Sequence, residues 1–128
     1  MFGHLTIGAR DFSGAAAFYD AALAPLGIER VLGTKYAGLA SWQRPGCTET
    51  LWVGKPWNGQ PASPGNGWMV AFTAPSRVAV DEAYAAALAA GGTDEGAPGP
   101  RPQFAADYYG AYVRDPEGNK LHFVRRGN

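Results

Sequence analysis

The chain contains two histidines, and they lie close to its two ends. His4 follows three residues of the N-terminus, and His122 follows the turn segment 115–119, whose sequence is DPEGN. Imidazole nitrogens bind divalent metal ions and also transfer protons near neutral pH. Three interpretations stay open: the two ends meet to hold a metal ion, His122 is a general base without a metal, or both histidines are hydrogen-bonded polar residues.

The composition limits the classes of function. The chain has 128 residues, of which 46% are hydrophobic, and this length and composition predict a single domain, residues 1–128, with a substantial core. Basic and acidic residues balance at 11 each, which disfavours a nucleic-acid partner. Lone Cys47 fits a reducing compartment. No apolar run is long enough to span a bilayer, and we expect a cytoplasmic protein without a membrane partner.

The sequence contains an internal repeat. The segment HLTIGARDFSGAAAFYDAAL, from His4, aligns with MVAFTAPSRVAVDEAYAAAL, from Met69. Each copy predicts a short alternating strand, then a capping residue (Asp11 or Ser76), then a small amphipathic helix that ends near glycine. The expected buried helix faces are Ala15, Phe18, Tyr19 and Ala22 in the first copy, and Val80, Ala83, Tyr84 and Ala87 in the second.

The remainder of each repeat predicts strands and turns. KYAGLASWQ and DYYGAYVRD are strand-like, ETLWVGK and NKLHFVRR are the last strands, and DPEG favours a type I hairpin turn. The Pro/Gly-rich segment GKPWNGQPASPGNG predicts a linker between the halves. The predicted class is therefore α+β, with βαβββ modules at about 1–55 and 66–127. Their sheets are expected to curl around a shared cleft, with the helices outside.

These motifs resemble those of the vicinal oxygen chelate superfamily, which includes glyoxalase I, fosfomycin-resistance transferases, extradiol dioxygenases and bleomycin-binding proteins. The resemblance is carried by HLTIGARD with AFYDAALAPLG, by GWMVAFTAPS with AAALAAGGTDEGAPGPRP, and by YYGAYVRDPEGNKLHFV. It covers nearly the whole chain and is greatest to the small bacterial glyoxalase-like proteins. It implies the fold, but this fold hosts isomerases, transferases, oxygenases and binders.

The resemblance also implies four positions for metal ligands. In the metal-dependent members these are usually histidine on the first strands and glutamate on the last strands. The four positions here hold His4, Trp52, Met69 and His122. His4 matches, whereas His122 stands where glutamate is usual, and Trp52 and Met69 are not expected ligands. The strand period of two independently places the same four side chains on the face away from the helices.

Aromatic side chains are expected to line the cleft. The resemblance to fosfomycin-type members implies a cleft tyrosine at Tyr112, and the strand period and the repeat extend the lining from there. Gln103 and Phe104 occupy the loop GAPGPRPQFAADYY, where related sequences carry histidines. A cleft filled by these rings as ordinary core is the alternative. The predicted substrate-binding residues are Tyr36, Trp42, Trp52, Met69, Gln103, Phe104, Tyr108 and Tyr112, with His122 and Tyr112 as catalytic candidates.

Two functions follow from this lining. The first is a binding protein that holds a small aromatic or apolar molecule in the cleft between the modules, with a degraded set of metal ligands. The second is a lyase, isomerase or dioxygenase of the glyoxalase type, with a divalent ion (Zn, Ni, Mn or Fe) on His4 and His122. Whether the chain is an enzyme stays open. A small-molecule partner and a homodimer are implied by the resemblance.

Overall fold

The secondary structure repeats once along the chain. The computed structural model describes residues 1–32 and 36–127. The first half contains β1 (His4–Gly8), α1 (Phe12–Leu23), the 3₁₀ turn η1 (Ala24–Leu26), β2 (Glu29–Arg30), β3 (Leu39–Gln43) and β4 (Thr50–Gly54). The second half contains β5 (Val70–Thr73), α2 (Arg77–Ala89), β6 (Thr93–Pro100), β7 (Tyr108–Arg114) and β8 (Lys120–Arg126).

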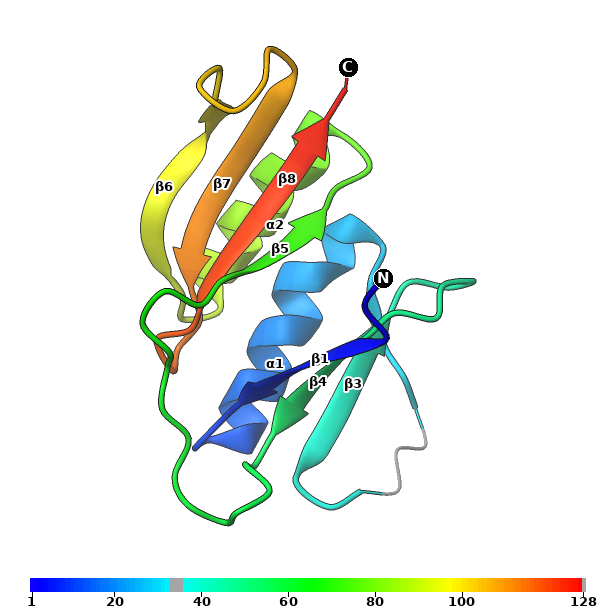
Figure 1. Ribbon diagram of the computed structural model, residues 1–128, viewed down its shortest axis with the longest axis vertical. Coiled ribbons are helices and arrows are strands. Elements are labelled where there is room, and N and C mark those ends of the chain that lie inside the picture. The colour runs from blue at the N-terminus through cyan, green and yellow to red at the C-terminus, as the bar shows by residue number, and fades with distance from the viewer. Residues whose placement is uncertain (33–35, 128) are drawn as a thin grey trace.

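The strands form two four-stranded mixed sheets. Their strand orders are β1-β4-β3-β2 and β5-β8-β7-β6, so the two sheets have the same topology (Figure 1). The first strand of each half pairs in parallel with the last strand, β1 with β4 and β5 with β8, and the other pairs are antiparallel. The predicted α+β class and the two βαβββ modules are confirmed. The described strands form two separate sheets instead of one continuous sheet.

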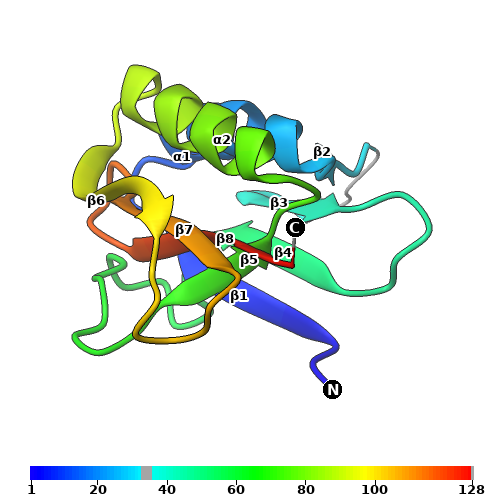
Figure 2. The same cartoon turned by 90° about the horizontal axis from the view of Figure 1, so that it is seen from above.

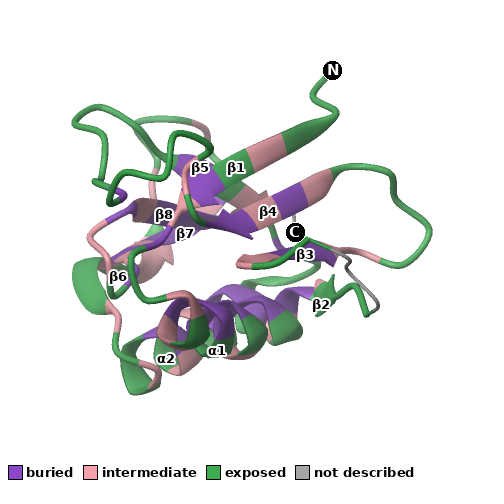
Figure 3. Ribbon diagram, turned by 90° about the horizontal axis from the view of Figure 1, so that it is seen from below, coloured by how far each residue is buried: buried purple, intermediate pink, exposed green. Residues whose placement is uncertain are grey.

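Both helices lie on the same side of the two sheets (Figure 2). The faces that helical periodicity predicts are the buried ones, from Ala15 to Ala22 in α1 and from Val80 to Ala87 in α2. Tyr84 is half-buried, and its hydroxyl donates to Asp94 at 2.8 Å. The inner helix faces and the central strands are buried, whereas the outer helix faces are exposed (Figure 3). Each fully buried Leu or Phe stabilises this layer by about 1.5–3 kcal/mol.

The predicted helix caps are confirmed. The Asp11 carboxylate accepts from the backbone N–H of Gly14 at 3.1 Å, and the Ser76 hydroxyl accepts from that of Ala79 at 3.0 Å. Each such bond satisfies a donor that has no partner within the helix and contributes about 1 kcal/mol. Within the described residues, neither helix is long and apolar enough to cross a membrane.

The expected hairpin turn joins β7 to β8. The backbone N–H of Asp115 donates to the carbonyl of Asn119 at 2.9 Å, and that of Gly118 donates to the Asp115 carbonyl at 3.0 Å. Gly118 has φ +97°, a left-handed conformation that favours glycine. Buried Asp115 accepts from the Tyr19 hydroxyl of α1 at 2.6 Å, which attaches this turn to the first module.

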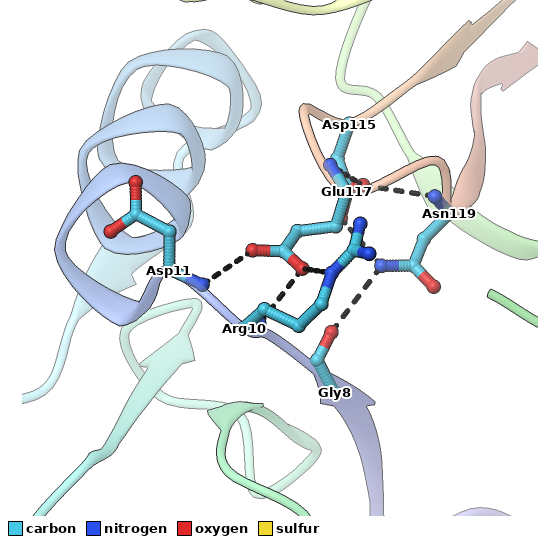
Figure 4. A network of polar contacts seen from close by, with 6 residues as sticks. All are labelled: Gly8, Arg10, Asp11, Asp115, Glu117 and Asn119. Atoms are coloured by element: carbon cyan, nitrogen blue, oxygen red, sulfur yellow. Dashed lines mark hydrogen bonds and ion pairs between the residues drawn. The ribbon is translucent and has the colours of Figure 1, made fainter. Parts of the chain in front are cut away.

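This hairpin turn also holds the start of α1 (Figure 4). The Glu117 carboxylate accepts from the backbone N–H groups of Arg10 at 2.8 Å and Asp11 at 2.7 Å, and from Arg10 Nε at 3.1 Å. Asn119 Nδ2 donates to the Gly8 carbonyl at 3.4 Å. Burial raises the pKa of Glu117, but the bonds from Arg10 and Asp11 outweigh it and lower that pKa. We call these contacts the turn clamp.

Two strand predictions differ from the structure. The segment GAPGPRPQFAADYY is expected as a loop, but its first residues, up to Pro100, belong to β6. β6 is an edge strand, where proline costs no ladder hydrogen bond on the open side. The strand expected over KYAGLASWQ begins only at Leu39, and Lys35 lies outside the described residues.

Candidate functional site

A cavity lies on the face of the first sheet that points away from α1. Thr6 pairs with Trp52 in the β1–β4 ladder, and their neighbours Leu5 and Leu51 pack on the core side. Because successive side chains alternate, His4, Thr6 and Trp52 share the opposite face. They line a cavity of about 640 Å³, together with Tyr36 and most of the linker from Lys55 to Ser63. We call it the linker cavity.

Aromatic rings form much of its wall. The Tyr36 and Trp52 rings meet edge to face, with centroids 5.9 Å apart and an interplanar angle of 72°. Trp57 of the linker also borders the cavity, although its side chain is fully exposed, and His4 and Thr6 bring the polar groups of the sheet. A cavity with apolar walls and few polar groups suits a small organic ligand. The predicted grouping of His4, Tyr36 and Trp52 on one face agrees with this geometry.

Sequence analysis missed the linker as part of this site. The Gly/Pro-rich composition predicts a connection, and the structure places that connection across the open sheet face, with Ala62 close to Gly8. A Cβ atom at Gly8 would lie 2.8 Å from the Ala62 Cβ, so glycine permits this approach. The large aromatic Trp57, in an otherwise small and polar segment, is the feature that could have indicated a role.

The predicted face of Trp42, away from the helices, is wrong. In the β3–β4 ladder Ser41 pairs with Trp52, whereas Trp42 pairs with Leu51 and therefore lies on the helix side. The Trp42 ring centroid lies 5.7 Å from that of Tyr19, and its Nε1–H donates to Asp20 at 3.0 Å. Its face was expected from a strand over the whole of KYAGLASWQ, but β3 begins only at Leu39. The bend there, with Gly38 at φ +72°, breaks the alternation.

A second cavity lies between the two modules. It has a volume of about 400 Å³ and is lined by residues of β1, β3, β4 and β5, among them His4, Leu5, Trp42 and Val70. Of these two cavities, the expected shared cleft is the smaller one. The linker cavity belongs to the first module and its linker.

A stack of rings occupies the open face of the second sheet. The Tyr112 and His122 rings are parallel within 7°, with centroids 4.0 Å apart, and Tyr108 lies on the other flank of His122 at 5.7 Å. Phe104 packs on Tyr108 at 5.1 Å. Gly110 lies beneath the His122 ring. A Cβ atom at this position would overlap that ring, so glycine permits the stack. Four of the predicted site residues, Phe104, Tyr108, Tyr112 and His122, therefore form one group, the ring stack.

Both ring nitrogens of His122 have partners. Nδ1 lies 2.8 Å from the Ala111 carbonyl oxygen, which only accepts, so Nδ1 carries the proton. Nε2, 2.7 Å from the Tyr108 hydroxyl, is then the acceptor. Burial lowers the pKa of His122, the bond to Ala111 opposes this, and nearby cations lower it further. His122 is therefore a neutral imidazole with a fixed tautomer.

The residues present do not fit the metal site that the resemblance implies. A metal ion on His122 would need the Nε2 lone pair, which already accepts from Tyr108. Neither cavity lined by His4 includes His122. In residues 1–32 and 36–127, no group of three or more His, Cys, Asp or Glu side chains is arranged to hold a metal ion.

The two remaining predicted residues lie apart from the linker cavity. Met69, directly before β5, lines a small cavity beside Trp68 and Lys120. Gln103 is exposed in the segment between β6 and β7, next to Phe104. Neither lies beside Trp52 in the cavity that holds His4.

Comparison with known protein families gives a match over nearly the whole chain. Residues 1–123 match the family model described as the Glyoxalase/Bleomycin resistance protein/Dioxygenase superfamily. No curated protein sequence matches the chain at a significant level.

Several solved structures are similar. A glyoxalase/bleomycin resistance protein from Albidiferax ferrireducens T118 is 39% identical, with a TM-score of 0.86 and coverage of 99% of each chain. A glyoxalase-related enzyme from Fulvimarina pelagi is 19% identical, with a TM-score of 0.75 over 98% of this chain and 88% of that one. A lactoylglutathione lyase from Agrobacterium tumefaciens is 23% identical, with a TM-score of 0.62 over 98% and 92%. The last two likenesses show the fold alone.

Proposed function

Because the chain belongs to the glyoxalase/bleomycin resistance protein/dioxygenase superfamily, we propose that it binds a small aromatic or apolar molecule in the linker cavity, without a metal ion. The observation that carries the proposal is the cavity of about 640 Å³ with Trp52, Tyr36 and Trp57 in its wall. This volume lies in the range of roughly 300–1,000 Å³ that is usual for small-molecule sites.

The wall chemistry supports a flat ligand. Edge-to-face packing of Tyr36 on Trp52 leaves ring surface for a further aromatic group, and such contacts contribute about 0.5–1.5 kcal/mol beyond area burial. His4, Thr6 and Lys55 supply hydrogen-bonding groups at the wall, and these would orient a ligand that carries one or two polar atoms.

Fluorescence titration with 1-naphthol, a flat neutral probe, tests this site. We expect binding to the wild type with quenching of tryptophan emission, and about tenfold weaker binding to Trp52→Leu, equivalent to roughly 1.4 kcal/mol. Trp68→Leu is the matched control, since Trp68 is a half-exposed tryptophan that does not line the linker cavity. Equal affinity of the two variants, or no binding by the wild type, would sink the proposal.

The alternative function is a lyase, isomerase or dioxygenase of the glyoxalase type that uses a divalent ion on His4 and His122. It requires His122 to give up the bond from Tyr108. Metal analysis after incubation with zinc, nickel, manganese and iron separates the two functions. About one equivalent of metal in the wild type, lost in His122→Ala, supports the enzyme, and no retained metal supports the binding protein.

The proposed partners are a small molecule and a second copy of the chain. The homodimer is proposed from the resemblance to this family, whose members often form dimers about a two-fold axis. Light scattering of the purified protein measures it directly, and a monomer mass at micromolar concentration would contradict it.

A further inference from the structure

Three cations surround the ring stack on the open face of the second sheet. Arg101 Cζ lies 5.7 Å from the centre of the Tyr112 ring, and Lys120 Nζ lies 5.4 Å from the same centre. Arg126 Cζ lies 5.2 Å from the centre of the Tyr108 ring. Like charges held around one group of rings give this face a positive potential unless acids neutralise them.

The ion pairs of the described residues lie away from these three cations. Ion pairs among residues 1–32 and 36–127 join Arg10 to Glu117, Arg30 to Asp20, and Arg114 to Glu95. None of these pairs involves a cation of the ring stack. Within the described part of the chain, no carboxylate lies within 4.0 Å of the three cations.

The groups that do contact these cations carry no net charge. The Arg101 guanidinium donates to the carbonyl oxygens of Ala97 at 2.7 Å and Pro100 at 3.2 Å, which fix its position. The aromatic rings attract cations only through their quadrupoles. His122, at the centre of the stack, is neutral, because burial lowers its pKa and Arg101, Arg126 and Lys120 lower it further.

A cavity adjoins the ring stack at Lys120. It has a volume of about 330 Å³, and its wall contains Trp68, Met69, Arg114 and Lys120. Arg114 is paired with Glu95, so Lys120 is the cation of this cavity whose charge is not balanced by a described acid. The cavity therefore offers apolar surface from Trp68 and Met69 beside an unbalanced ammonium group.

We propose that this cavity and the adjacent Tyr112 face form an anion-binding site for a small aromatic carboxylate. The aromatic ring of the ligand would lie against Trp68, Met69 and Tyr112, and its carboxylate would bind Lys120. Arg101, which lies near the same Tyr112 ring as Lys120, would add a second positive charge. Charge-assisted hydrogen bonds of this kind are roughly twice as strong as neutral ones. This site is separate from the linker cavity and does not depend on the proposed function.

The size and charge of the site favour a small anion over a polyanion. The cavity of about 330 Å³ accommodates one ring with its substituent. Nucleic acids bind extended basic surfaces, whereas the whole chain has 11 basic and 11 acidic residues. A monocarboxylate matches the single charge of Lys120, the cation of the cavity that no described acid balances.

Titration with benzoate tests the site, with benzyl alcohol as the neutral probe of similar shape. We expect benzoate to bind at least about tenfold more tightly than benzyl alcohol and to shift backbone amide signals of residues 68–69, 112 and 120 in NMR spectra. Lys120→Gln and Arg101→Gln should each weaken benzoate binding by about three- to tenfold. Added salt should weaken it as well.

Two control variants make the outcome specific. Arg77, at the start of α2, lies 5.1 Å from the Tyr109 ring and outside this site. Arg77→Gln removes this cation and should bind benzoate as the wild type does. Trp52→Leu should also leave it unchanged. Equal binding of both probes, unchanged affinity in both site variants, or loss in Trp52→Leu would overturn the proposal, and the last result would assign benzoate to the linker cavity.

Discussion

His122 is a histidine whose neighbours fix it in the neutral form. Its Nδ1–H is bound to a backbone carbonyl, its Nε2 accepts from Tyr108, and its ring is buried against Tyr112. Sequence alternation correctly placed this ring on the face away from the helices. It could not show that Tyr108 would occupy the nitrogen that a metal ion requires, because that contact depends on the register of β7 against β8.

The lowered pKa of His122 predicts a pH dependence of stability. The unfolded chain binds a proton near pH 6.5, and the folded protein binds it only at lower pH. Stability is therefore full above about pH 6.5 and falls as pH decreases toward the folded-state pKa, by at most about 1.4 kcal/mol per pH unit. Urea denaturation between pH 7 and 5 should show a shallower fall in His122→Gln. The matched control His4→Gln, which leaves the ring stack intact, should follow the wild type, and parallel curves for all three would contradict the prediction.

At the scale of elements, the sequence predicted faces well where one side of a strand is uniformly apolar. The alternation in β1 and β4 gave the correct sides of Leu5, Leu51 and Trp52. It failed in β3 because the alternation was counted from residues before Leu39, where the strand has not begun. A shift of one residue then placed Trp42 on the wrong face. The path of the linker over the sheet has no periodic pattern, so its place in the site could not be predicted.

The close approach of the linker to β1 gives a prediction for the linker cavity. Gly8→Ala places a methyl group 2.8 Å from the Ala62 Cβ, so the linker must shift. We expect 1-naphthol to bind about tenfold more weakly, with the free energy of unfolding reduced by less than about 1 kcal/mol, because the change lies at the surface of the core. Gly3→Ala is the matched control, since nothing lies within 4 Å of the added methyl. Unchanged naphthol affinity in Gly8→Ala would show that the linker does not shape the site.

At the scale of the whole molecule, the two modules share one core and are joined by the turn clamp. Buried residues from both sheets and both helices belong to one hydrophobic cluster. The repeat in the sequence predicted two modules of the same topology, because each copy carries the same order of strand, cap and helix. The polar contacts between them join residues more than 100 positions apart and follow from no local pattern.

The turn clamp predicts an unequal effect of two glutamate substitutions. Glu117→Gln replaces a carboxylate that accepts from Arg10 and Asp11, and should reduce the free energy of unfolding by about 1–3 kcal/mol at pH 7. Because the pKa of Glu117 is lowered, this stabilisation exists above about pH 4.5 and disappears as pH falls through the folded-state value. Glu95→Gln, which breaks a partly exposed pair with Arg114 within one module, should cost about 1 kcal/mol or less. Chemical denaturation measures both, and equal losses would contradict a special role for the turn clamp.

The turn clamp also has a consequence for how the chain is made. Glu117 is translated 106 residues after Asp11, whose backbone N–H it accepts from. The start of α1 therefore leaves the ribosome long before its carboxylate partner exists, and Tyr19 on the inner face of that helix lacks its acceptor Asp115 until the second half arrives. These polar contacts between the modules form only after the second module is made, and translation that stops before Glu117 yields a chain whose two halves lack the bond to Asp11.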